Sequence, residues 1–148
     1  MKRVLMIFMA CFWMLLTANA QSGLNIEPLF AGKIIPQQRM VETRVKGKML
    51  SKYQLTLFRS VRFQANNKQE ITRVHDLIEL DKKTNPHQVY SENYSSTKSR
   101  SKETLMLQLS QEGNHNRFLC YKRSNEEVTV IYMEGTLNSL DTLRELIK

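Results

Sequence analysis

Residues 105–133 read LMLQLSQEGNHNRFLCYKRSNEEVTVIYM, and this stretch decides the fold. It opens with alternating leucines and continues with two runs that are rich in apolar, β-branched and aromatic residues. Two groups of turn-forming residues, Glu112-Gly113-Asn114 and Ser124-Asn125-Glu126, separate the three runs. Because short connections join antiparallel neighbours, the pattern predicts a three-stranded antiparallel meander.

A long helix and two further strands are expected upstream of the meander. Asn67 followed by Glu70 is typical of a helix start, and the apolar residues that follow recur at helical spacing, which predicts a helix over about 67–83. Residues 39–46 alternate with a period of two, which predicts a strand with one buried face. Residues 55–63 are rich in β-branched and aromatic residues, which predicts a second strand.

The remaining segments complete an α+β domain. Residues 25–32 suggest a short helix with Asn25 as N-cap, and the polar residues 85–103 favour an exposed strand or hairpin. A last helix is expected after Asn138 or Ser139. The predicted fold is a single antiparallel sheet of about five to six strands with helices packed on one face.

Arg59 interrupts the apolar face of the strand predicted over 55–63. One interpretation is a β-bulge at Arg59-Ser60 that turns the arginine outward. The other is that Arg59 stays on the inner face and is held there by a carboxylate.

The first twenty residues have the pattern of a secretory signal peptide. Lys2 and Arg3 precede an apolar run over 4–16, and small residues lead to a cleavage site between Ala20 and Gln21. The apolar run has about 13 residues, whereas a membrane-spanning helix needs about 20. We therefore expect export to the periplasm, the cell surface or the medium, with no transmembrane segment after cleavage.

Signal cleavage defines the predicted domains, which are a signal peptide over 1–20 and a single α+β domain over 21–148. Cys11 lies in the middle of the apolar run, and a lipoprotein with Cys11 lipidated is the weaker alternative. Cys120 is then the one cysteine of the mature chain, which excludes an intramolecular disulfide and a cysteine-based zinc site.

The chain is basic, with a formal net charge of +8 that falls to about +6 after signal removal. Lys98, Arg100 and Lys102 are the candidate contacts for a polyanion such as a glycan or lipopolysaccharide. Nucleic acid is not expected as a partner, because export separates the protein from it and stacking aromatic residues are sparse. The other candidate members of this basic patch are Arg59, Arg62, Arg117, Lys122 and Arg123.

No catalytic, cofactor-binding or metal-binding residues are predicted. His75 and Glu79 have the spacing of half a metal site, but neither His87 nor His115 is identifiable as a third ligand. Cys120 lies within a strand pattern and is expected to be a small buried residue. The sequence also contains no glycine-rich phosphate loop and no nucleophile elbow.

The C-terminal part of the chain resembles small exported Bacteroidetes proteins that are classed as domains of unknown function. The similar segments are Glu127–Gly135 with Leu137–Leu143, and, earlier in the chain, Gly47–Leu50 and Leu57–Ser60. The resemblance implies a periplasmic or surface-associated α+β domain with no assigned activity and no catalytic residues to carry over. It also implies that Asp141-Thr142-Leu143 is similar to the O-glycosylation triplet of that phylum.

The sequence thus predicts an exported binding or interaction domain without catalytic activity. Its expected partner is an envelope protein or an anionic glycan or lipid. Two alternatives stay open. The first is a polyanion binder that acts through a basic surface, and the second is a hydrolase whose site is not recognisable from sequence.

Overall fold

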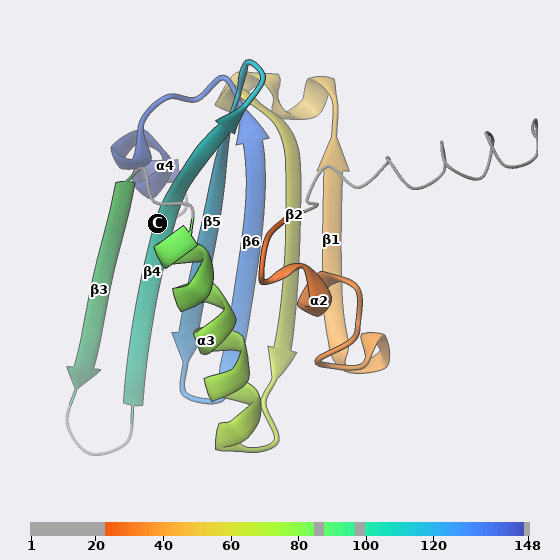
Figure 1. Ribbon diagram of the computed structural model, residues 1–148, viewed down its shortest axis with the longest axis vertical. Coiled ribbons are helices and arrows are strands. Elements are labelled where there is room, and N and C mark those ends of the chain that lie inside the picture. Colours follow the sequence, from red (N-terminus) through yellow and green to blue (C-terminus); the bar gives the residue numbers. More distant parts are fainter. Residues whose placement is uncertain (1–22, 85–87, 97–99, 147–148) are drawn as a thin grey trace, which may run out of the picture.

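The structure is a computed structural model that describes residues 23–84, 88–96 and 100–146. Six strands form one antiparallel sheet in the order β1-β2-β6-β5-β4-β3 (Figure 1). The strands are β1 (Met40–Lys46), β2 (Leu55–Gln64), β3 (Gln88–Ser96), β4 (Arg100–Glu112), β5 (His115–Ser124) and β6 (Glu127–Gly135). The helices are α2 (Glu27–Phe30), α3 (Lys68–Thr84) and α4 (Leu140–Leu146), with 3₁₀ turns η1 (Gln37–Arg39) and η2 (Lys48–Tyr53).

This architecture confirms the α+β class, the single antiparallel sheet and the meander β4-β5-β6. The polar segment 85–103 contributes a strand, β3, which pairs with β4. Between β2 and β3 the chain crosses one face of the sheet as α3, and the meander then returns strand by strand until β6 lies against β2 (Figure 1). This path brings β2 beside β6 although more than sixty residues separate them in sequence.

The sheet has an apolar cluster on each face, because successive residues of a strand point to opposite sides. Leu107, Tyr121 and Val130 belong to the cluster beneath α2 and α3. Met106, Cys120 and other alternate residues belong to the second cluster, together with Leu residues of η2 and α4. The expectation of helices on one face therefore holds for α2 and α3, whereas α4 lies behind the sheet in Figure 1 and packs on the other face.

Arg59 lies on the inner face beneath α2, so the interpretation that a bulge turns it outward is wrong. The pairing of β2 with β1 and β6 is regular at Arg59, and the irregularity lies between Leu55 and Leu57 instead. The Arg59 Nε atom donates to Glu42 Oε1 at 2.9 Å, and the guanidinium lies 4.9 Å from the centre of the Phe30 ring. A carboxylate and an aromatic face thus hold the cation inside, as the second interpretation stated.

Two local expectations are also corrected. β1 has no fully buried residue, and Val41 is 57% exposed, because β1 is an edge strand beyond the reach of α3. Asn25 is not the N-cap of α2, since Ile26 occupies that position without a side-chain cap hydrogen bond. The amide groups of Asn25 bond to α3 instead, with Asp81 as their main acceptor.

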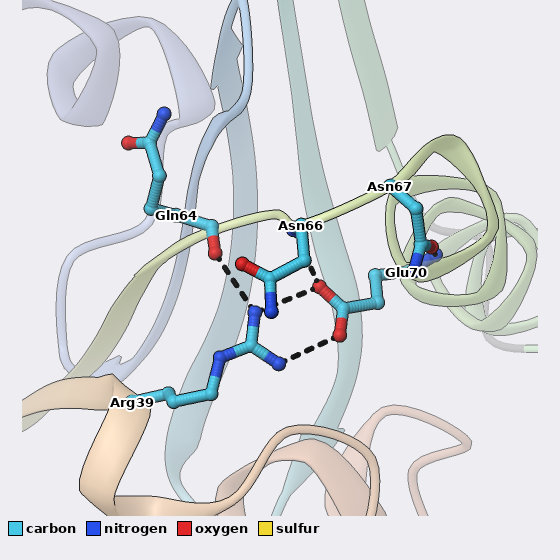
Figure 2. Close-up of polar contacts among 5 residues, drawn as sticks. All are labelled: Arg39, Gln64, Asn66, Asn67 and Glu70. Carbon is cyan, nitrogen blue, oxygen red and sulfur yellow. Dashed lines mark hydrogen bonds and ion pairs between the residues drawn. The ribbon is translucent and has the colours of Figure 1, made fainter.

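The start of α3 is fixed by a polar network that the sequence predicted in part (Figure 2). Asn67 Oδ1 accepts the backbone N–H of Glu70 at 3.0 Å, so Asn67 caps the helix as expected. The Glu70 carboxylate in turn accepts the backbone N–H of Asn66 and two bonds from the Arg39 guanidinium, at 2.7 and 3.0 Å. Arg39 also donates to the carbonyl oxygen of Gln64, which ties η1 to the β2–α3 connection.

This network predicts a pH dependence of stability. Hydrogen bonds from Arg39 lower the pKa of Glu70 from its usual value of 4.5, so its ionised form stabilises the folded state. That contribution is present above the unfolded pKa and is lost as the pH falls through the folded pKa. We expect Glu70→Gln to lower the Tm at pH 7, and the difference from wild type to disappear towards pH 3. Thermal melts across this pH range measure the Tm difference, with Glu126→Gln as an exposed control. A Tm difference that stays constant with pH would contradict the stabilising role of the ionised Glu70 carboxylate.

Candidate functional site

A polar cluster joins α3 to the sheet on the face that α3 covers. His75 Nε2 lies 3.1 Å from Glu103 Oε1 of β4 and 3.9 Å from Glu79 Oε1, one helical turn further along α3. The imidazole meets the Tyr121 ring edge-on, with ring centres 5.7 Å apart. The Tyr121 hydroxyl is buried without a hydrogen-bond partner among the described residues, and burial raises its pKa to about 12.

This cluster lacks the layout of a metal site. Both carboxylates lie near the same imidazole nitrogen, Nε2, which Glu103 contacts at hydrogen-bond distance and Glu79 at ion-pair distance. Across the described ranges, no three histidine, cysteine, aspartate or glutamate side chains are grouped so that they would hold a metal ion. His115 is exposed at the start of β5, and His87 lies outside the described residues.

Cys120 is a core residue, as the strand pattern predicted. Its side chain is fully buried in the cluster on the α4 side of the sheet. Burial raises the pKa of the thiol to about 11, and the nearby positive charge of Lys122 offsets only part of that effect. At neutral pH Cys120 is therefore a protonated thiol, which is a poor nucleophile.

The structure sorts the predicted basic patch into two groups. Arg62, Lys102 and Lys122 lie on the face opposite α3, because each alternates along its strand with a residue of the cluster beneath α3. Arg62 and Lys122 pair with opposite sides of Thr129, which places their strands about 10 Å apart. Arg62 and Lys102 are exposed. Three strands thus bring three cations to one surface, which we call the basic face.

Three of the other predicted members, Arg59, Arg117 and Arg123, do not belong to the basic face. Arg59 lies beneath α2, as described above. Arg117 is 7% exposed, donates to the carbonyl oxygen of Ser110 and forms an ion pair with Glu112. Arg123 donates to the carbonyl oxygen of its own turn residue Asn125. Arg100 is the first residue of β4, and Lys98 lies outside the described residues, as do Cys11, Ala20 and Gln21.

The basic face contains a shallow hollow of about 310 Å³ at the end of the meander. Its walls carry ammonium groups and hydroxyls, which donate hydrogen bonds to anionic oxygens, together with one carboxylate. The threonine hydroxyls were not among the predicted site residues, although the period-two alternation around Val128 and Val130 already placed Thr129 on the opposite face from them. The lining residues are Lys102, Thr104, Lys122, Arg123, Ser124, Glu127 and Thr129.

The triplet Asp141-Thr142-Leu143 lies in the first turns of α4. Asp141 and Thr142 are exposed, whereas Leu143 is buried in the cluster on the α4 side of the sheet. Ser139 Oγ accepts the backbone N–H of Thr142 at 3.4 Å, which supports Ser139 as the cap of this helix.

Comparison with known proteins gives one match. Residues 13–147 match a family described as a family of unknown function, DUF6108. No curated protein and no solved structure matches the chain. In the part of the chain that the structure describes, no helix is long and apolar enough to cross a membrane.

Proposed function

The chain belongs to the DUF6108 family, and we propose that it is an exported domain that binds an anionic glycan or lipopolysaccharide of a Bacteroidetes cell envelope. The observation that carries this proposal is the convergence of Arg62, Lys102 and Lys122 on one face from three different strands. Charges that converge in this way raise the local concentration of anionic ligands more than the same charges spread over the surface.

Two further features support this role. The basic face is the part of the sheet that α4 and η2 leave uncovered, so an extended polymer has access to it along the strands. Ammonium groups and hydroxyls alternate across the strands, and this mixture suits the sulfate, phosphate and carboxylate groups of acidic polysaccharides. The signal-peptide pattern of residues 1–20 supports export.

The same proposal gives the domain a binding role without catalysis. Cys120 is buried and protonated at neutral pH. His75 lies on the opposite side of the sheet, where Glu103 and Tyr121 are its neighbours. Neither the Cys120 thiol nor the His75 imidazole is among the groups that line the hollow of the basic face, whose one carboxylate is Glu127.

The proposal predicts weaker retention on a heparin column after charge reversal on the basic face. Arg62→Glu/Lys102→Glu/Lys122→Glu should elute at clearly lower salt than wild type, because exposed charge contacts weaken as salt screens them. The matched control is Lys68→Glu/Arg73→Glu/Lys83→Glu on exposed positions of α3, which changes the net charge equally. The control should keep most of the retention, and thermal melts of both variants check folding.

Two results contradict the proposal. Equal loss of retention in both variants means that net charge alone governs binding. Salt-resistant capture of one envelope protein by wild type and by the basic-face variant alike makes the domain a protein-interaction module instead.

A further inference from the structure

An apolar groove lies at the end of the sheet where η2 and α4 meet β2 and β6. It has a volume of about 280 Å³, at the small end of ligand-pocket sizes. All but one of its lining side chains are purely hydrocarbon or thioether, and the exception is the Tyr53 phenol. β2 and β6 contribute Phe58 and Met133, η2 contributes Leu50 and Tyr53, and α4 contributes Leu143 and Leu146.

Exposed apolar side chains gather around this groove. Five large hydrophobic side chains are exposed in the described part of the chain, and three of them belong to η2 or to the end of α4. These are Met49, which is 78% exposed, Tyr53 at 39% and Leu146 at 43%. Exposed apolar side chains that gather in one region of a surface mark a contact with a membrane or another molecule.

The η2 side of the groove carries positive charge without acidic neighbours in sequence, whereas α4 on the other side carries the exposed Asp141 and Glu145. Residues 43–69 contain no aspartate or glutamate, and basic residues flank and interrupt η2. Lys52 Nζ lies 4.7 Å from the centre of the Tyr53 ring, so a cation and an aromatic side chain share the mouth of the groove. The exposed basic residues of this segment are Arg44, Lys46, Lys48 and Lys52.

We propose that η2 and the end of α4 dock the domain on an anionic lipid bilayer. Met49 and Tyr53 enter the interfacial layer, where amphipathic aromatic side chains are favoured, and the flanking lysines meet anionic headgroups. The groove accepts part of one acyl chain. Charge complementarity selects this occupant, because cations border the apolar surface on its η2 side, and anionic headgroups would pair with those cations whereas a neutral protein surface would not. This docking surface is separate from the basic face, so it goes beyond the proposed glycan binding.

Vesicle flotation with the purified protein tests the proposal. We expect the wild type to float with vesicles of phosphatidylglycerol and phosphatidylcholine at low salt, and not with phosphatidylcholine alone. Lys48→Glu/Lys52→Glu should lower the partition coefficient at least about tenfold, since each lysine near an anionic surface contributes to binding. Met49→Ser/Tyr53→Ser should lower it as well.

Matched controls exist at positions outside the groove. Val41→Ser/Leu80→Ser removes equally exposed apolar side chains, and Lys68→Glu/Lys83→Glu reverses two exposed lysines of α3. Both should float like the wild type. The variant Arg62→Glu/Lys102→Glu/Lys122→Glu should keep vesicle binding while it loses heparin retention, so the two proposals fail separately.

Four results would overturn the docking proposal: no flotation of the wild type with anionic vesicles, equal flotation with neutral vesicles, unchanged flotation of the η2 variants, or equal loss in the controls. Two other occupants of the groove have their own signatures. Saturable binding of a fluorescent fatty acid without vesicle binding makes it a pocket for a free ligand. Concentration-dependent dimerisation that Leu146→Glu abolishes, again without vesicle binding, makes it an interface between copies.

Discussion

Asp81→Ala is expected to lower the free energy of unfolding by about 3 kcal/mol. Asp81 is fully buried on α3, and its carboxylate accepts the backbone N–H groups of Asn25 at 2.7 Å and Ile26 at 3.0 Å. It also accepts the side-chain amide of Asn25 at 3.1 Å. Alanine would leave these donors without their acceptor in a buried or half-buried site, and hydrogen bonds to a carboxylate are among the stronger ones.

The loss of stability in Asp81→Ala should extend to α2, because these hydrogen bonds hold the start of α2 against the last turns of α3. Ile26, Leu29 and Phe30 are fully or almost fully buried, and their packing depends on that anchor. Burial raises the pKa of Asp81 above its usual value, while the bonds from Asn25 and Ile26 oppose that rise.

Chemical denaturation measures the effect, with Asp76→Ala as the control on an exposed position of the same helix. Asp81→Asn should fall between the two, since it keeps one acceptor oxygen. A loss of unfolding free energy for Asp81→Ala that lies within 0.5 kcal/mol of the loss for the control would contradict this prediction. It would show that water or a local rearrangement replaces the hydrogen bonds that Asp81 accepts.

Gly135→Ala is expected to lower the free energy of unfolding by a similar amount, about 3 kcal/mol. Gly135 ends β6, where the backbone of Gln54 and Leu55 passes close to its Cα atom. An added methyl carbon would lie 2.7 Å from the Leu55 Cα and even closer to the Gln54 carbonyl oxygen. That oxygen also accepts the N–H groups of Thr136 and Leu137, so the backbone has little freedom to move away.

The control for this prediction is Gly113→Ala in the β4–β5 turn. Gly113 has a φ of 62° and open space around it, so alanine there costs about 1 kcal/mol of backbone strain without a clash. Denaturant unfolding of the two variants separates steric clash from strain. If Gly135→Ala loses no more unfolding free energy than Gly113→Ala, the close contact between Gly135 and the backbone of Gln54 and Leu55 is contradicted.

Local sequence signals predicted most of the elements. The Asn67 and Glu70 pair marked the start of α3, and the turn residues around Gly113 and Asn125 separated the strands of the meander. These signals depend on neighbours within a few residues, which the sequence shows directly.

Long-range pairing was the part that sequence did not supply. Asn25 looked like a helix cap because its acceptor, Asp81, lies fifty-six residues away. The sequence could not distinguish the two interpretations of Arg59. The deciding contact is with Glu42, which lies on β1 and meets Arg59 only because β1 pairs with β2. Alternation showed which residues of one strand share a face, but only the strand order brought Arg62 of β2 close to Lys122 of β5.

The central claim is that an anionic ligand binds on the sheet face opposite α3. The most direct test is a nuclear magnetic resonance titration of the isotope-labelled protein with a size-defined heparin oligosaccharide, followed through backbone amide shifts. We expect salt-sensitive shifts that centre on Arg62, Lys122 and Thr129. Shifts that centre on α3, or that spread evenly over all basic residues, would contradict it.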